Sequence, residues 1–158
     1  IREIRDVGAR IRMIQDGDVA GGLMAAMHDT GIDMLMGIGG APEAVITAAA
    51  LKCIGGEMQT QLWLRNDDER RTVEEKGIDV NHVFHCDDLV NGTDISVAVT
   101  GLTDGVLLEG VKFTRRGAFT ESLVLRSSSG TIRKIETLHR PTKIGNLDEG
   151  MTITPPII

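Results

Sequence analysis

The sequence predicts an α/β fold, in which a mostly parallel mixed sheet is flanked by helices and ends in a C-terminal antiparallel meander. Apolar runs of strand length alternate with helical patterns from the N-terminus to about Gly101. Beyond Gly101, runs rich in β-branched residues are separated by closely spaced turn signals. A length of 158 residues suits one domain or a part of a larger one.

The first predicted elements are a helical end, a strand and a helix. Ile1, Ile4 and Val7 recur at helical spacing, so we expect the chain to open partway through a helix, as a fragment or processed piece would. A short strand is predicted from Ala9 to Gln15, where polar and apolar residues alternate. A helix of small residues is then predicted from Val19 to Met27.

The next pair of elements is the most distinctive in the chain. The residues IDMLMGIGG, Ile32 to Gly40, are apolar almost throughout, which predicts a strand buried on both faces. A helix is predicted from Pro42 to Ile54, because proline favours the first turn of a helix and glycine favours the position after its end. Gly55 and Gly56 supply that end.

The remaining elements lead from the helical region into the meander. A strand is predicted from Met58 to Leu64, then a solvated helix capped by Asn66 and ended by Gly77. A short helix around Asp87 to Asn91 precedes a strand of β-branched residues, DISVAVTG, over 94–101.

Turns at Arg116-Gly117 and Ser129-Gly130 divide the rest into an antiparallel meander. The end of the chain has no periodicity. We therefore expect an α/β unit over residues 1–140 and a loose or docked tail over residues 141–158.

Composition excludes several classes of partner. The formal net charge is -6, and the chain has one Trp, three Phe and no Tyr, which argues against a nucleic acid or an anionic membrane as the main partner. No apolar run reaches the roughly 18 residues of a membrane span. Cys53 and Cys86 lack CxxC spacing and are expected to be reduced thiols of a cytoplasmic protein. The four His residues do not have the spacing of a zinc site.

Two loops at the predicted strand ends carry unusual residues, and ligands of open parallel sheets bind beyond the carboxyl ends of the strands. The first loop is Asp16-Gly17-Asp18. Its two carboxylates would point the same way in extended chain and could hold a metal or sugar hydroxyls. The alternative is a turn in which Asp18 caps the helix that begins at Val19.

The second loop runs from Gly37 to Glu43. Glycines and a helix start favour bound anions, but a GxGxxG dinucleotide motif would need glycine where Pro42 stands. A tight turn without a ligand explains the glycines equally well. Glu43, at the second predicted helical position, could contribute about 0.3–1 kcal/mol through the helix dipole. It could instead bind a hard cation such as Mg²⁺ or Mn²⁺, which would require further ligands.

Other candidates are weaker. Asp104 follows another predicted strand end and is expected near the same rim. Arg126 and the following SSSG could bind phosphate, although a serine-glycine turn beside a surface arginine explains them as well.

Several of these segments together resemble a known family. DGDVAGGLMAAM, MGIGGAPEAVITAAALKCIGG, VTGLTDGVLLEGVKF and ESLVLRSSSGTIRKIET, in this order, closely resemble the C-terminal half of class II (GlpX-type) fructose-1,6-bisphosphatases. The resemblance runs from about Ile1 to Thr137. It implies a layered αβαβα sugar-phosphatase fold and metal-dependent hydrolysis of the 1-phosphate of fructose 1,6-bisphosphate in gluconeogenesis. Some members also hydrolyse sedoheptulose 1,7-bisphosphate, and members tend to be homo-oligomers.

The resemblance also implies roles for particular residues. Glu43 matches the family's metal-ligand glutamate, for Mn²⁺ or Mg²⁺. Asp16, Gly17 and Asp18 match the segment that contacts the sugar phosphate, and Gly40 matches a substrate-contacting glycine.

Two family segments have no match here: the Asp-Pro-Ile-acidic-Gly-Thr segment, which supplies other metal carboxylates, and the basic segment that holds the distal phosphate. Both would lie upstream of Ile1, in a missing N-terminal half. We therefore expect no catalytic residue in this chain and no phosphatase activity from it alone. The alternatives are a Rossmann-like nucleotide-binding module and a non-catalytic remnant that assembles with a partner chain.

Overall fold

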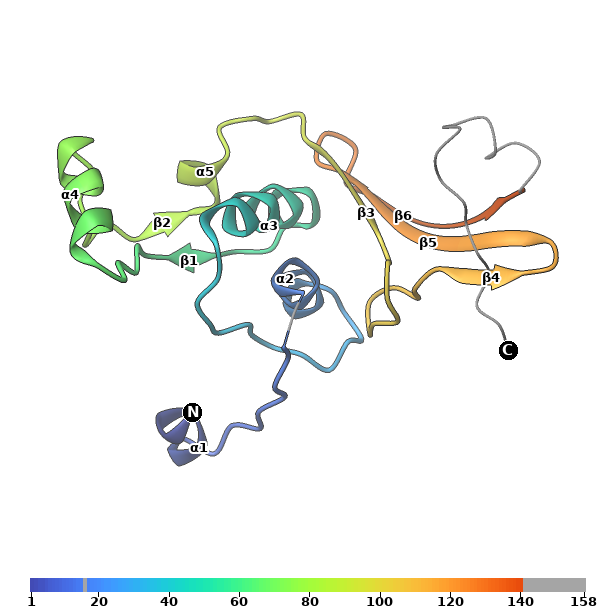
Figure 1. The fold of residues 1–158 in the computed structure, drawn as a ribbon, viewed down its shortest axis with the longest axis horizontal. Coiled ribbons are helices and arrows are strands. Elements are labelled where there is room, and N and C mark those ends of the chain that lie inside the picture. Colours follow the sequence, from blue (N-terminus) through green and yellow to red (C-terminus); the bar gives the residue numbers. More distant parts are fainter. Residues whose placement is uncertain (16, 141–158) are drawn as a thin grey trace.

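The computed structural model describes residues 1–15 and 17–140 and shows a mixed α/β chain (Figure 1). The helices are α1 (Arg2–Asp6), α2 (Asp18–Ala26), α3 (Ala41–Ile54), α4 (Asp67–Glu75) and α5 (Cys86–Leu89). The strands are β1 (Gln59–Thr60), β2 (Phe84–His85), β3 (Ser96–Thr100), β4 (Lys112–Thr114), β5 (Gly117–Arg126) and β6 (Thr131–His139). The predicted tail, 141–158, lies outside the described residues.

The predicted helices are confirmed, and their ends follow from local chemistry. Pro42 lies in the first turn of α3, and Gly55 ends the helix in the left-handed region, at φ 76°. The side chain of Asn66 accepts a hydrogen bond of 2.8 Å from the backbone N–H of Glu69 and so caps α4.

The antiparallel meander is also confirmed. The long strand β5 is central: β3 pairs with its second half, from Thr100 opposite Ser122 to Ser96 opposite Arg126, and β4 pairs with its first three residues. On its other side β6 pairs along its whole length, from Ala118 opposite His139 to Arg126 opposite Thr131. β1 and β2 form a separate two-stranded ribbon.

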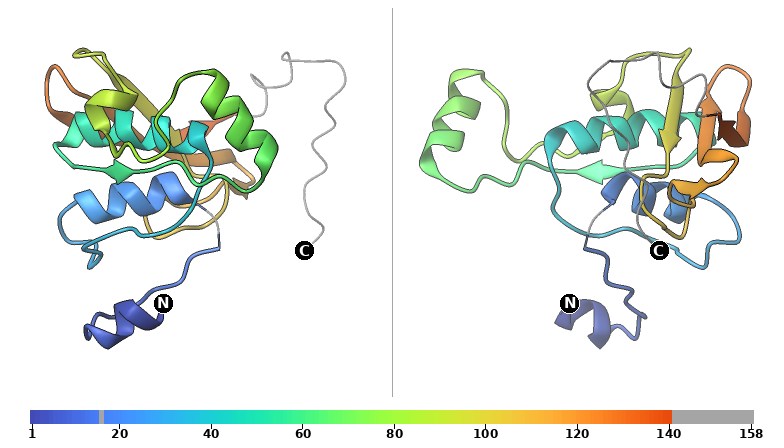
Figure 2. Two further views of the ribbon diagram at one scale, coloured as in Figure 1. Left: turned by 90° about the vertical axis from the view of Figure 1, so that its left-hand side faces the viewer. Right: turned by 45° about the vertical axis from the view of Figure 1, so that its right-hand side comes forward.

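The core lies where the helices pack on this sheet. Figure 2 shows α2 and α3 beside each other on one side of the strands. The buried residues of this cluster are Leu23, Ala50, Cys53, Leu108, Leu123 and Leu125. α2 approaches α3 closely at Gly22, where an added Cβ would lie 2.6 Å from Cγ2 of the buried Thr47. The small residues of these helices therefore permit the close packing that brings their N-terminal ends together.

A polar cluster ties the β5–β6 turn to the segment before β3. Arg126 donates to the Asp94 carboxylate from Nε at 3.2 Å and from Nη2 at 3.1 Å, and Ser128 donates to it at 2.8 Å. The hydrogen bond from Arg126 lowers the pKa of Asp94, and that from Ser128 lowers it further. The Ser127 hydroxyl donates to Thr93 O at 2.8 Å.

The predicted mostly parallel sheet is not confirmed, because every strand pair in the part of the chain described here is antiparallel. The predicted strands over 9–15 and 32–40 do not form, and the strand predicted over 58–64 is reduced to Gln59–Thr60. Both segments lie outside the helices and strands of the structure and have no ladder partner. A strand needs a neighbouring strand for its backbone hydrogen bonds, and an apolar pattern alone cannot supply one.

Segment 32–40 also lacks the burial that its sequence predicts. The exposed fractions are 69% for Met34, 65% for Met36 and 70% for Ile38. The apolar run therefore lies open along one side of the molecule, next to α2.

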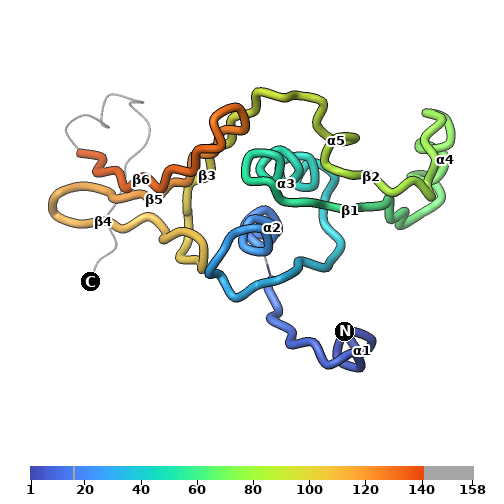
Figure 3. Tube along the Cα trace, turned by 180° about the vertical axis from the view of Figure 1, so that it is seen from behind, coloured from blue at the N-terminus to red at the C-terminus, as the bar shows by residue number. Residues whose placement is uncertain are grey.

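A second feature extends away from the core. Figure 3 shows the β1–β2 ribbon carrying α4 on the side opposite the large sheet.

Both cysteines are unpaired thiols, Cys53 buried in the core and Cys86 half-buried at the start of α5, and burial raises the pKa of each. Across the described residues, no helix is long and apolar enough to cross a membrane.

Candidate functional site

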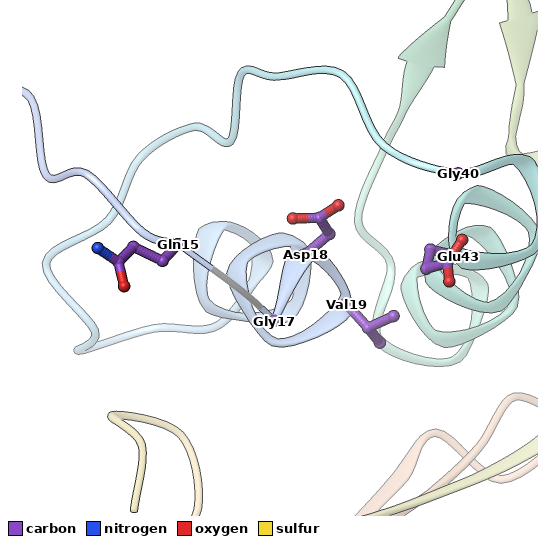
Figure 4. A pocket seen from close by; sticks show the side chains of 6 residues that line it. All are labelled: Gln15, Gly17, Asp18, Val19, Gly40 and Glu43. Carbon is purple, nitrogen blue, oxygen red and sulfur yellow. The ribbon is translucent and has the colours of Figure 1, made fainter. Parts of the chain in front are cut away.

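Four residues predicted to form the site lie around an open hollow of about 440 Å³ where α2 and α3 begin (Figure 4). The residues that line it are Gln15, Gly17, Asp18, Val19, Gly40 and Glu43. The two carboxylates come from α2 and α3, which pack against each other beneath the hollow.

Asp18 is the first residue of α2, and its side chain does not cap that helix. The N-cap is Gly17, at φ 85°, a left-handed conformation that favours glycine, and Gly17 has no side chain to bond the free N–H groups. The alternative role of Asp18 as a helix cap is therefore excluded. Its carboxylate instead lies against Gly39, where an added Cβ would be 2.6 Å from Oδ2.

Glu43 lies in the first turn of α3, at the third helical position, because the helix begins one residue before the predicted start. Its side chain is exposed and folds back over Gly40, so that an added Cβ on Gly40 would collide with Oε2. The Thr47 hydroxyl donates to the backbone carbonyl of Glu43 at 2.8 Å and anchors this turn. The Asp18 carboxylate thus lies against Gly39, and the Glu43 carboxylate lies against the next residue, Gly40.

Both carboxylates lie at the N-terminal ends of helices, where the partial positive charge of the backbone favours negative groups. None of the six residues lining the hollow is cationic. Carboxylate oxygens are the donors that Mg²⁺ and Mn²⁺ prefer, and they also accept hydrogen bonds from sugar hydroxyls. The donor chemistry therefore fits a hard cation or a polyol.

The number of donors is smaller than a metal centre needs. In the described part of the chain, no group of three or more His, Cys, Asp or Glu side chains is placed to hold a metal ion. Glu43 and Asp18 can supply one side of such a site, and the other ligands would have to come from elsewhere.

The structure brings together four of the five predicted site residues: Gly17, Asp18, Gly40 and Glu43. The fifth, Asp16, lies outside the described residues. Sequence reasoning missed the role of Gly39 and the presence of Gln15 on the rim. No local sequence signal identifies Gly39, because its contact with Asp18 joins residues that are distant in sequence.

Two other candidates lie outside the hollow. The Asp104 carboxylate accepts from the N–H of Gly110 at 2.9 Å and so stabilises its own loop. The Arg126 guanidinium is paired with Asp94, which supports the turn interpretation rather than a phosphate site.

Comparisons with known proteins identify one family. Residues 1–139 match the family described as bacterial fructose-1,6-bisphosphatase, glpX-encoded. A D-fructose 1,6-bisphosphatase class 2/sedoheptulose 1,7-bisphosphatase from a Synechococcus strain is 45% identical over 152 residues, and a protein of the same name from a second strain is equally similar. A fructose-1,6-bisphosphatase class 2 from Haemophilus influenzae is 40% identical over 152 residues.

The coverage of these matches is uneven. Each includes 88% of this chain but only 44% of either Synechococcus protein and 46% of the Haemophilus influenzae protein. The chain thus spans less than half the length of the curated relatives it matches.

Proposed function

From the premise that the chain belongs to the bacterial, glpX-encoded fructose-1,6-bisphosphatase family, we propose that it forms the C-terminal half of a fructose-1,6-bisphosphatase. The reaction is hydrolysis of the 1-phosphate of fructose 1,6-bisphosphate, giving fructose 6-phosphate and phosphate in gluconeogenesis. The observation that carries this proposal is the pair of carboxylates, Asp18 and Glu43, seated on Gly39 and Gly40 at one hollow. Residues 1–140 are the α/β half of the enzyme, and 141–158 are a tail.

The two carboxylates have different roles in this proposal. Glu43 is a ligand of a divalent metal, Mn²⁺ or Mg²⁺, for which its oxygen donors suit. Such a metal, when bound, polarises a phosphoryl oxygen and lowers the pKa of a water. Asp16 and Asp18 accept hydrogen bonds from the sugar and orient it, while the backbone at Gly17 and Gly40 approaches the substrate closely.

What this half contributes to the rate is therefore positioning. Carboxylates held by helix ends and glycine contacts need little rearrangement when a sugar phosphate arrives. The attacking water and the remaining metal ligands would be held by the residues upstream of Ile1, so this chain alone has no phosphatase activity.

The finer fold belongs to the same proposal. Segments 9–15 and 32–40 become strands of the mostly parallel sheet when the N-terminal half supplies their neighbours, within the layered αβαβα architecture. The exposure of Met34, Met36 and Ile38 supports this, because an apolar run of that length is rarely left in water. The full-length protein is a cytoplasmic homo-oligomer, dimer or tetramer, and whether it also takes sedoheptulose 1,7-bisphosphate is an outcome of the assay below.

The test is phosphate release from fructose 1,6-bisphosphate by the full-length protein with Mg²⁺ or Mn²⁺. Glu43→Gln should lower release at least a hundredfold, roughly the effect of removing one charged group from a polar site, about 3 kcal/mol. The matched control is Glu57→Gln, an exposed glutamate beyond the other end of α3, which should retain wild-type release.

Release that survives Glu43→Gln would return Glu43 to a helix-dipole role. No release with either metal would favour the nucleotide-binding alternative, which a rise of the melting temperature with NAD or ATP would then support.

A further inference from the structure

The outer edge of β6 is the longest free strand edge among the described residues. β5 is the only described strand that pairs with β6, and Figure 1 shows β6 on the side of β5 away from β4. An edge of this length leaves a row of backbone N–H and C=O groups available to another strand. Two of its apolar side chains are also accessible, Ile132 at 48% and Ile135 at 39%.

The sequence of this edge is complementary to itself in the antiparallel direction. When two copies of Thr131–His139 are paired about a two-fold axis through Ile135, Lys134 of each copy lies opposite Glu136 of the other. The same register places Ile135 opposite Ile135 and Ile132 opposite Leu138. Opposite charges and apolar pairs are the cross-strand neighbours that stabilise a sheet.

Neighbouring registers lack this match. An axis through Lys134 places the two Lys134 side chains opposite each other, and an axis through Glu136 does the same for the two Glu136 side chains. Like charges directly opposite are destabilising. A parallel, in-register pairing would align Arg133, Lys134 and Glu136 each with its own copy. The charges therefore favour one arrangement, centred on Ile135.

We propose that β6 is an interface between two copies of this protein, in which the β6 edges pair antiparallel about a two-fold axis at Ile135 and join the two sheets into one. Such an interface is isologous, because each copy contributes the same residues. The proposal rests on the homo-oligomer proposed above and not on the reaction, so enzymatic activity is not its readout.

The test is a charge exchange in the full-length protein, followed by light scattering coupled to size-exclusion chromatography. Glu136→Lys makes both of the facing charge pairs lysine against lysine, and Lys134→Glu makes both of them glutamate against glutamate. We expect each variant alone to have half the molar mass of the wild type. An equimolar mixture of the two should regain the wild-type mass, because lysine then faces glutamate in both pairs.

The controls separate the interface from damage to the fold. Glu136 makes no ion pair within the described residues, whereas Lys134 bonds the Glu121 carboxylate at 2.8 Å, so Glu136→Lys is the cleaner change. Lys112→Glu breaks a comparable pair, with Glu109 at 2.6 Å, on the opposite side of β5 from β6, and should keep the wild-type mass. A monomeric wild type, single variants of wild-type mass, or a mixture that stays at the lower mass would each overturn the proposal.

Discussion

Segments 34–38 and 96–100 both lie within predicted strands, but only the second forms a strand in the structure. β3 is paired residue by residue with β5, and its Val97 and Val99 pack against the core. The other segment forms no strand and has no partner, and Met36 and Ile38 stay largely exposed. An apolar run therefore indicates that a segment favours burial. Whether the segment forms a strand depends on a neighbouring strand that can bond its backbone.

The paired region should be the most sensitive to loss of side-chain volume. Leu125→Ala should lower the free energy of unfolding by about 2–5 kcal/mol. Leu125 is fully buried on β5, so the change loses transfer free energy and leaves a cavity. Urea denaturation of the 158-residue chain measures this. Leu102→Ala, at a residue 80% exposed here, is the control and should change stability by less than about 0.5 kcal/mol. Equal losses of unfolding free energy for the two variants would contradict this expectation.

The unpaired region gives a sharper test, because its behaviour should depend on the N-terminal half. In the full-length protein Ile38→Ser should cost about 1.5–3 kcal/mol, the value for removing a buried apolar side chain. In the 158-residue chain the same change should cost almost nothing, since Ile38 is already exposed. A negligible cost in both would mean that this segment remains exposed in the complete enzyme.

A smaller effect is expected where this segment meets the site. Gly39→Ala should displace the Asp18 carboxylate and raise the KM for fructose 1,6-bisphosphate about 5–30-fold, equivalent to one or two kcal/mol. Gly37→Ala is the matched control, because an added Cβ there meets nothing within 4 Å. Steady-state kinetics of the full-length protein compare the two, and an unchanged KM for Gly39→Ala would remove Asp18 from the substrate site.

Local sequence chemistry predicts the helices and turns of this chain but not all of its strands. Helix limits were predicted to within a residue or two, because Asn66, Pro42 and Gly55 act locally. The meander was predicted because its turns are local as well. The strands over 9–15 and 32–40 were predicted but do not form, because pairing depends on residues distant in sequence.

The candidate site was predicted in part for the same reason. Motif and resemblance selected Gly17, Asp18, Gly40 and Glu43, and packing of α2 on α3 brings them together. The contact between Asp18 and Gly39 could not be predicted, because it depends on how closely the two helices approach at Gly22. The residues that would complete a metal centre are not among those of this chain that the structure describes.

The central position of β5 has a consequence for the order of folding. Its pairing with β6 closes only the short turn 127–130, whereas its pairing with β3 must first close the connection 101–121. The entropy of closing a loop grows with its length, so the first pairing costs about 1.5 kcal/mol less to begin. Pulse-labelled hydrogen exchange during refolding should therefore protect the amides of the β5–β6 hairpin before those of β3, and protection of β3 first would contradict this order.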